Sequence, residues 1–515
     1  MQISRVALLL TISWCFSSCQ SNHDCKFQIM VNRTYGTGLF SRGFCHFLGI
    51  PYAKPPRGSR QFRPPEGVNL QDFPAKFWNL TQRSENCIQY DFENNGLNGS
   101  EDCLFLNVYS KPWVSHLQPV VVWIHGGTFN FGSGFSDSAD LPDLLINNNI
   151  TVVTLNYRLG VLGFLYRERE SVTRNNGLKD QQEALRWVQR NIAHFGGDPT
   201  KVTLMGWSAG SAAVSYHLYD STSEGLFHAA IMMSGSFLNP WAYAPSPQTC
   251  LSTMCEQMQI SCKNQGKLRE TLEGLAIEKN QPLLTPITFF GMEFPCFVPS
   301  GPYPQMLVKR KPNIDVPLMI GYTSHETEQQ IKFNYMENTL SNYDFPNSNR
   351  FDIIENYVRT QISEFNRTNL LVAADLIYGM VKFTEEYTSR TKSNTFLYKF
   401  SLGDAHHGDD LSLIFRETTY NTNDKTLDTT IKESQITSAK LVQLWSNFIK
   451  FQNPTPSLQP LLKVLWLPFN SSKGREYLNI GHNLTMENFS EDATYKIWDG
   501  FYECLYHGNC INVPN

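Results

Sequence analysis

Apolar residues in this chain fall into short continuous runs separated by amphipathic or polar segments. Six runs of four to six residues are predominantly apolar and do not alternate with polar residues. This pattern is typical of strands that are covered by helices on both faces. The predicted strands lie at residues 120–124, 150–155, 202–205, 229–233, 316–321 and 395–400.

Two longer segments have helical spacing. Residues 180–195 start with Asp180 and Glu183, a spacing that resembles a capping box. Apolar side chains then recur on one face, at Ala184, Val188, Ile192 and Phe195. A second helix is predicted at residues 437–451, where the following Asn453-Pro454 would end it.

Strands mixed with helices from residue 120 onward predict the α/β fold class. We expect a central, mostly parallel twisted sheet with helices on both faces. The first 110 residues contain more turns and are expected to form a small antiparallel N-terminal edge. No internal repeat and no long linker interrupts the sequence, so residues 20–515 are predicted to form a single domain.

Residues 1–19 have the pattern of a cleaved signal peptide. Arg5 precedes an apolar run at residues 6–16, and small or polar residues follow as far as Cys19. Such a run is too short to span a bilayer, and no second apolar run approaches 18 residues. A buried N-terminal strand is the alternative interpretation. We expect a secreted, extracellular protein with no transmembrane segment or lipid anchor.

Composition agrees with export. Ten of the twelve cysteines lie beyond Cys19, an even number suited to disulfide bonds in an oxidising compartment. The net charge is −4 and basic residues are scattered, so no nucleic-acid partner is expected. Cysteine and histidine show no pairs at zinc spacing, so no metal site is expected. No cofactor is expected either. The sequons predicted to be glycosylated are Asn32, Asn79, Asn98, Asn366, Asn470, Asn483 and Asn488. A further sequon, at Asn149, abuts a predicted strand and is excluded from this prediction.

A candidate nucleophile comes directly after the predicted strand 202–205. The sequence Gly206-Trp207-Ser208-Ala209-Gly210 precedes a helix-compatible run at residues 211–218. A nucleophile elbow needs this strand–turn–helix context, because the sharp turn lifts the serine hydroxyl out of the sheet. The pentapeptide alone is a weak signal, with about 0.1–0.2 chance matches in a chain of this composition. Its context makes Ser208 the predicted nucleophile.

A glycine-containing loop follows the predicted strand 120–124. Its sequence is His125-Gly126-Gly127-Thr128. Glycines at a strand end let backbone N–H groups approach a ligand closely. Such donors stabilise the oxyanion of a tetrahedral intermediate by about 3 kcal/mol each. A simple turn is the alternative interpretation.

Longer stretches resemble the type-B carboxylesterase/cholinesterase family. Residues 195–210 (FGGDPTKVTLMGWSAG) are similar to its active-site signature, and residues 101–109 (EDCLFLNVY) to its second signature. Shorter similarities lie at residues 49–56, 123–129, 156–160 and 177–181. The resemblance implies the α/β-hydrolase fold and a serine carboxylesterase similar to secreted insect-type enzymes.

The resemblance also implies an acid for the catalytic triad. In this fold the acid lies between the serine and the histidine in chain order. The segment from Gly321 to Glu326 is similar to the family's glycine-led segment that ends in the acid. Glu326 is therefore the predicted acid, with Glu328 as a competitor.

For the base, two adjacent histidines compete. The family has Gly-Asp-Asp/Glu-Leu directly after its catalytic histidine and an aromatic residue eight positions after it, which fits His407 and Phe415. His406 fits only if the loop is shifted by one residue, so His407 is the predicted base. A neutral imidazole with an ordinary pKa near 6.5 suits a general base.

Further residues are assigned by the same resemblance. The oxyanion hole would comprise Gly126, Gly127, Thr128 and Ala209, with the N–H groups of the last three as donors. Thr128 stands where the family commonly has another small residue. Cys87 and Cys103 would form the family's first disulfide. The pairs Cys250–Cys262, Cys504–Cys510 and Cys25–Cys45 are guesses that leave Cys255 and Cys296 unassigned.

Aromatic residues near these segments predict an apolar substrate pocket, although any one of them could equally be a core residue. The predicted pocket residues are Trp207, Phe129, Phe131, Trp241, Phe289 and Phe290. Trp207 stands where relatives often have Glu, Gln or His. The Cys87–Cys103 loop lacks the tryptophan that binds cations in cholinesterases. We therefore expect a small-molecule ester other than a choline ester as substrate.

Two other functions remain open. The family includes catalytically silent extracellular adhesion and binding members, which usually lack a triad residue. A lipase is the other alternative.

Overall fold

The computed structural model describes the strands of a large sheet and helices that cover it. The described residues are 25–29, 34–68, 77–91, 96–112, 115–135, 142–165, 174–244, 252, 255–256, 298–301, 307–326, 377–415, 425–470, 474–488 and 493–504. The predicted signal peptide, residues 1–19, lies outside these ranges.

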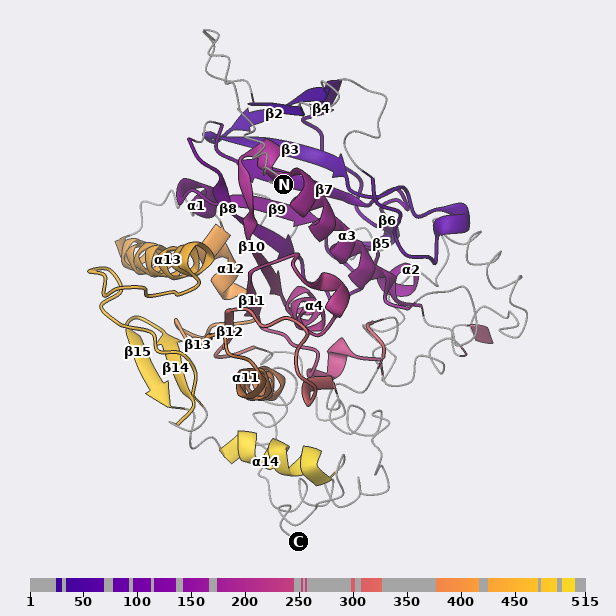
Figure 1. Ribbon diagram of the computed structural model, residues 1–515. Coiled ribbons are helices and arrows are strands. Elements are labelled where there is room, and N and C mark those ends of the chain that lie inside the picture. The colour runs from indigo at the N-terminus through magenta and orange to yellow at the C-terminus, as the bar shows by residue number, and fades with distance from the viewer. Residues whose placement is uncertain are drawn as a thin grey trace, which may run out of the picture.

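A single large sheet organises the described part of the chain (Figure 1). Its strands are β1 (Cys25–Ile29), β2 (Thr34–Ser41), β3 (Phe44–Pro51), β4 (Phe77–Leu80), β7 (Phe105–Ser110), β8 (Gln118–Ile124), β9 (Thr151–Leu155), β10 (Gly197–Trp207), β11 (Ala229–Met233), β12 (Leu318–Thr323), β13 (Thr395–Phe400), β14 (Glu476–Ile480) and β15 (Leu484–Asn488). The order is β1-β2-β3-β7-β9-β8-β10-β11-β12-β13-β14-β15, and β4 pairs with β2. A separate ribbon pairs β5 (Gln89–Asp91) with β6 (Gly96–Asn98).

Strand direction divides this sheet into a parallel centre and antiparallel edges. From β9 through β8, β10, β11, β12 and β13 to β14, every neighbour is parallel. The N-terminal strands β1, β2, β3 and β7 pair antiparallel, as β15 does at the other edge. The prediction of a mostly parallel sheet with an antiparallel N-terminal edge is confirmed.

Helices cover both faces of the sheet. They are α1 (Asp143–Asn147), α2 (Gly160–Phe164), α3 (Asn176–Asn191), α4 (Ala209–Leu218), α11 (Tyr378–Arg390), α12 (Asp409–Phe415), α13 (Lys425–Phe451) and α14 (Ala493–Tyr502). Short 3₁₀ turns are η1 (Gly58–Arg60), η3 (Ile192–Phe195), η4 (Ser221–Ser223) and η5 (Pro240–Ala242). In Figure 1, α1, α12 and α13 gather on one side of the central strands, and α3, α4 and α11 on the other.

The hydrophobic core accordingly has two parts. Alternate side chains of β8 point to opposite faces, as the two-residue period of a strand requires. Val120 and Val122 join the cluster that contains buried residues of α3, α4 and α11. Val121 and Trp123 join the cluster that contains residues of α1, α12 and α13. Burial on both faces explains why this strand is continuously apolar in the sequence.

The predicted start of the first helix is wrong. α3 begins at Asn176, so Asp180 lies inside the helix and does not cap it. The Asp180 carboxylate instead accepts bonds from the backbone N–H, Nε and Nη2 of Arg158, at 3.0, 2.8 and 2.7 Å. Both side chains are buried, and a buried guanidinium needs such a partner. Glu183 likewise bonds Arg190 at 2.8 Å instead of a capping N–H.

The second predicted helix begins earlier than expected. α13 spans Lys425–Phe451, whereas the apolar pattern predicted a start at residue 437. Thr437 is 2% exposed and Leu441 is fully buried, so the predicted part of the helix lies against the core. The preceding turns are largely polar in sequence. Their apolar residues, Leu427, Ile431 and Ile436, are too sparse to extend the periodic pattern that the prediction used.

Candidate active site

Four segments that follow strands meet at one edge of the sheet. Because β8, β10, β12 and β13 all belong to its parallel part, their carboxyl ends share that edge. His125 directly follows β8, and Ser208 directly follows β10. Glu326 comes shortly after β12, and His407 shortly after β13. Sequence-distant polar residues are thereby brought together.

Ser208 occupies a sharp turn between β10 and α4. Its backbone angles are φ 55° and ψ −122°, a region that costs a residue with a side chain about 1–3 kcal/mol. The Ser208 N–H donates to the carbonyl of Met233 at 2.8 Å, and the Ser208 carbonyl accepts from Ala212 N–H at 2.9 Å. These bonds hold the strained peptide between β11 and α4. Ser208 is 7% exposed.

The turn also requires close packing of α4 on the end of β8. A Cβ at Gly210 would overlap the carbonyl oxygen of Ile124, the last residue of β8. A Cβ at Gly206 would overlap the carbonyl of Gly210. Both glycines of the pentapeptide therefore hold the serine close to the loop that follows β8.

That loop lies directly against the serine. A Cβ at Gly126 would come within 3.1 Å of Ser208 Cβ. Ala209 is the first residue of α4, so the helix itself does not use its N–H. The residues predicted to form the oxyanion hole thus approach Ser208 from two segments.

Two consecutive left-handed residues shape the same loop. Thr128 has φ 49° and Phe129 has φ 62°. The carbonyl of Gly127 accepts from the N–H groups of Asn130 and Phe131, at 2.8 and 3.0 Å. Because its carbonyls are engaged within the turn, the peptide groups have a fixed orientation before any ligand binds. Such preorganisation is what an oxyanion hole needs.

Glu326 and His407 form a close pair. His407 Nδ1–H donates to Glu326 Oε2 at 2.5 Å. The carboxylate is fully buried, whereas the imidazole is 27% exposed. The other oxygen, Oε1, accepts from the Thr323 N–H at 2.8 Å. The carboxylate is therefore fixed at the end of β12 and orients the imidazole through one nitrogen.

The neighbouring histidine points elsewhere. His406 Nδ1–H donates to the carbonyl of His325 at 3.3 Å, and its backbone N–H donates to Asp409 Oδ2 at 2.7 Å. The structure thus pairs His407, and not His406, with Glu326. Glu328, the competing acid, lies outside the described residues.

A second buried acid near this pair was missed by the sequence analysis. Asp410 is fully buried, and its Oδ2 accepts from the Tyr398 hydroxyl at 3.1 Å. Burial, and after it the negative charge of Glu326, raise the pKa of Asp410 to about 7. Asp410 could have been noticed from the sequence, because it lies three residues after His407. That spacing was used only to choose between the two histidines.

Of the predicted pocket aromatics, two lie close to Ser208. The Trp207 ring lies 4.7 Å from the His407 ring, centroid to centroid. Gly235 lies between Trp241 and the backbone of Ser208. A Cβ on Gly235 would overlap the Ser208 carbonyl oxygen and would lie 3.0 Å from Trp241 Cη2. Phe131 is half-buried in the loop after β8.

The other pocket aromatics are placed differently. Phe129 is fully buried and packs edge-on against Phe164 at 5.2 Å, so it belongs to the core. Phe289 and Phe290 lie outside the described residues.

Two of the predicted disulfides are present. Cys87 bonds Cys103, and Cys25 bonds Cys45. Cys255 and Cys504 are also disulfide-bonded. The remaining cysteines named in the predictions, Cys250, Cys262, Cys296 and Cys510, lie outside the described residues.

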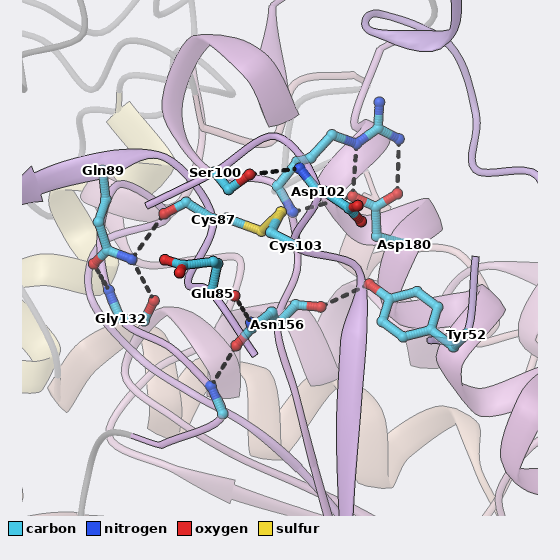
Figure 2. The surroundings of a disulfide bond; sticks show 12 residues. Tyr52, Glu85, Cys87, Gln89, Ser100, Asp102, Cys103, Gly132, Asn156 and Asp180 are labelled. Carbon is cyan, nitrogen blue, oxygen red and sulfur yellow. Dashed lines mark hydrogen bonds and ion pairs between the residues drawn. A yellow bond between two sulfur atoms is a disulfide. The ribbon is translucent and has the colours of Figure 1, made fainter. Parts of the chain in front are cut away.

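The Cys87–Cys103 disulfide supports the loop after β8 (Figure 2). Gln89 Nε2 donates to the carbonyls of Cys87 and Gly132, both at 3.0 Å. Gln89 Oε1 in turn accepts from the Gly132 N–H at 2.8 Å. A Cβ at Gly132 would lie 2.8 Å from the Gly126 carbonyl. The loop closed by this disulfide is therefore hydrogen-bonded to the segment that packs beside Ser208.

Most of the predicted glycosylation sites within the described residues are at the surface. Asn79, Asn98, Asn483 and Asn488 are exposed and Asn470 is half-buried. Asn32 and Asn366 lie outside the described ranges. Asn149, which was excluded, is exposed and accepts from Lys111 Nζ at 2.6 Å.

Within the described ranges, no helix has the length and apolar character that a membrane span requires. The same residues contain no group of three or more His, Cys, Asp or Glu side chains that could hold a metal ion.

Known proteins similar to this chain include esterases. A model of the carboxylesterase family matches residues 35–498. Esterase E4 of Myzus persicae is 30% identical over 522 residues, covering 89% of this chain and 91% of that protein. A solved PNB esterase has a TM-score of 0.73 at 25% identity, over 90% of this chain and 98% of its own. Neuroligin-2 of Mus musculus, whose name does not denote an esterase, is 28% identical over 531 residues, covering 84% of this chain and 62% of that protein.

Proposed function

Because this chain belongs to the carboxylesterase family and is a carboxylic ester hydrolase, we propose that it cleaves esters through a Ser208–His407–Glu326 triad. One observation carries this proposal. The buried carboxylate of Glu326 holds His407 Nδ1 at 2.5 Å, at the sheet edge where Ser208 has its strained backbone. Orienting carboxylate, imidazole and nucleophile are the three parts of this chemistry.

In the first step, Ser208 Oγ attacks the ester carbonyl carbon. With Nδ1–H donating to Glu326, His407 has its other nitrogen, Nε2, free of a proton and able to accept the hydroxyl proton. The negative charge that develops on the carbonyl oxygen is stabilised by the N–H groups of Gly127, Thr128 and Ala209, beside Gly126. The C–O bond to the alcohol then breaks, and the imidazolium returns its proton to the leaving alcohol.

A covalent acyl-enzyme on Ser208 is the product of this step. Water then attacks the acyl carbonyl carbon while His407 accepts a proton from it. The Ser208 oxygen leaves, takes that proton back from the imidazolium, and the carboxylic acid is released. No cofactor takes part, since the proton moves only among serine, imidazole, water and the leaving group.

The substrate that we propose is a small apolar ester. Trp207 and Trp241 beside Ser208 support an apolar surface near the reacting carbonyl. The loop closed by Cys87 and Cys103 contains no tryptophan to bind a quaternary ammonium group, so choline esters lack a cation–π partner there.

We extend the proposal to secretion, with a signal peptide at residues 1–19 and a single α/β-hydrolase domain at residues 20–515. The disulfides Cys25–Cys45 and Cys87–Cys103 and the exposed sequons support an oxidising, extracellular location. N-terminal sequencing of protein collected from culture medium should start near residue 20; a chain that stays in the cell with Met1 intact would contradict it.

A non-catalytic binding role is the second candidate, because the chain is also similar to Neuroligin-2. Silent members of the family usually lack a triad residue, whereas Ser208, His407 and Glu326 are all present here. The intact set favours the enzyme. A lipase is the third candidate and would be recognised by a rise in activity at a lipid–water interface.

The decisive experiment compares Ser208→Ala with wild type on a panel of short- and long-chain chromogenic acyl esters. We expect kcat/KM to fall about 10⁴-fold or more, because the nucleophile is lost. The exposed Ser115→Ala variant is the matched control and should retain activity. A slowly hydrolysed ester should add its acyl mass to Ser208 in wild type. Equal hydrolysis by wild type and Ser208→Ala would overturn the proposal.

A further inference from the structure

The Trp207 ring lies between two loops of the proposed site. Trp207 is the last residue of β10 and directly precedes Ser208. Its ring lies against His407, with 4.7 Å between the centroids and 34° between the planes.

Different atoms of the same indole ring are close to glycines of two different loops. A Cβ at Gly126 would lie 2.7 Å from Trp207 Cε3, and a Cβ at Gly408 would lie 2.8 Å from Trp207 Cζ2. Both distances are shorter than real Cβ contacts, so the ring fills the space between the loop after β8 and the loop that contains His407. Any larger residue at Gly126 or Gly408 would displace it.

Packing alone holds this ring within the described structure. Trp207 packs against the core cluster of α1, α12 and α13. Its Nε1 is buried and has no hydrogen-bond partner among the described residues. The position of the indole is therefore set by the segments that it contacts, and it in turn limits where the imidazole can go.

We propose that Trp207 is the positioning residue of the general base, holding the His407 imidazole between Glu326 and Ser208 and stabilising its charged form with the indole face. This inference rests on the proposed function. An aromatic face attracts a cation, so the contact favours the imidazolium that forms while Ser208 attacks. The carboxylate fixes one nitrogen of the imidazole, and the indole restricts rotation of the ring about that bond.

The test compares Trp207→Leu with Trp207→Phe in the full-length secreted protein. Leucine keeps an apolar side chain but removes the aromatic face, whereas phenylalanine keeps a face. For Trp207→Leu we expect kcat to fall about 10- to 100-fold with KM changed less than threefold. The acid limb of the kcat/KM profile should move to lower pH, because the imidazolium loses its aromatic partner. Trp207→Phe should retain kcat within about fivefold and keep the wild-type acid limb.

Active sites are counted by burst titration, so that kcat refers only to folded enzyme, and thermal unfolding is followed for both variants. A wild-type kcat and pH profile in Trp207→Leu would overturn the inference. So would equal losses in the leucine and phenylalanine variants with an unshifted acid limb, since a residue needed only for packing would behave that way. If Ser208→Ala hydrolyses esters as fast as wild type does, the proposed function itself fails. That result is obtained before the Trp207 variants are compared, so the two failures are distinguishable.

Discussion

Buried polar groups lie at both ends of helix α4, but the two ends differ in how these groups are hydrogen-bonded and in the strain of the backbone. At the C-terminal end, His217 has a partner on each ring nitrogen: Nε2–H donates to Gln181 Oε1 at 2.8 Å, and Nδ1 accepts from the Ser223 hydroxyl at 3.1 Å. Ser223 Oγ also accepts from Gln182 Nε2 at 2.9 Å. The backbone here is ordinary helix. This network ties α3, α4 and η4 together.

At the N-terminal end, strain and unpaired polar atoms accumulate. Ser208 has its rare backbone conformation. Buried atoms without a hydrogen-bond partner among the described residues include His125 Nε2, Trp207 Nε1, Ser234 Oγ and Asp410 Oδ1. Unpaired buried groups cost about 1–3 kcal/mol each. Among the described residues, the C-terminal network also contains one such atom, Gln181 Nε2, but its backbone carries no strain of this kind. Backbone strain together with several unpaired buried groups is typical of a functional site, which favours the N-terminal end.

Replacing the base gives the largest expected effect and tests this comparison at the N-terminal end. His407→Ala should lower kcat/KM about 10⁴-fold, equivalent to about 5.5 kcal/mol of transition-state stabilisation. His406→Ala is the matched control and should stay within about tenfold of wild type, because its imidazole contacts the His325 carbonyl and not Glu326. Greater loss in His406→Ala than in His407→Ala would reverse the assignment.

At the C-terminal end the same kind of replacement should affect stability and not chemistry. His217→Ala removes a fully buried ring and leaves Gln181 Oε1 and the Ser223 hydroxyl without it. We expect the free energy of unfolding to fall by about 4 kcal/mol, from the cavity and the stranded polar groups. Denaturant unfolding measures this, and kcat per active site should be unchanged. A large loss of kcat at normal stability would mean that the two ends are not functionally distinct.

The smallest expected effect is a loss of stability at low pH that depends on His217. Burial lowers the pKa of His217 to about 4. Between pH 6.5 and 4 the unfolded chain therefore binds a proton at this residue that the folded protein does not. The stability contributed by neutral His217 is present above pH 6.5 and falls as the pH decreases towards 4, by about 3 kcal/mol.

His217→Gln keeps a polar side chain that does not titrate in this range. Between pH 7 and pH 4, wild type should lose about 3 kcal/mol more of its free energy of unfolding than His217→Gln does. His116→Gln, at an exposed histidine, should follow the wild-type pH dependence. Parallel curves for wild type and His217→Gln would show that this histidine is not held neutral by burial.

Much of the fold could be predicted from the sequence. The six apolar runs are all strands, because burial on both faces leaves a continuous apolar signal. Helix starts were less predictable. Asp180 fitted a cap by spacing, yet it pairs with Arg158, and no local pattern reveals a partner so distant along the chain. The start of α13 is largely polar, and its few apolar residues were too sparse to reveal a helical period.

The site divides in the same way. The sequence by itself determined the family, the elbow around Ser208 and the loop beginning at His125, because each is a local pattern of glycines and strand ends. Only the tertiary structure decided that His407 and not His406 contacts Glu326, that Asp410 lies buried nearby, and that Trp207 packs on the imidazole. These facts depend on where separate strands end in space, and that is set by the order and twist of the sheet and by packing between side chains far apart in the chain.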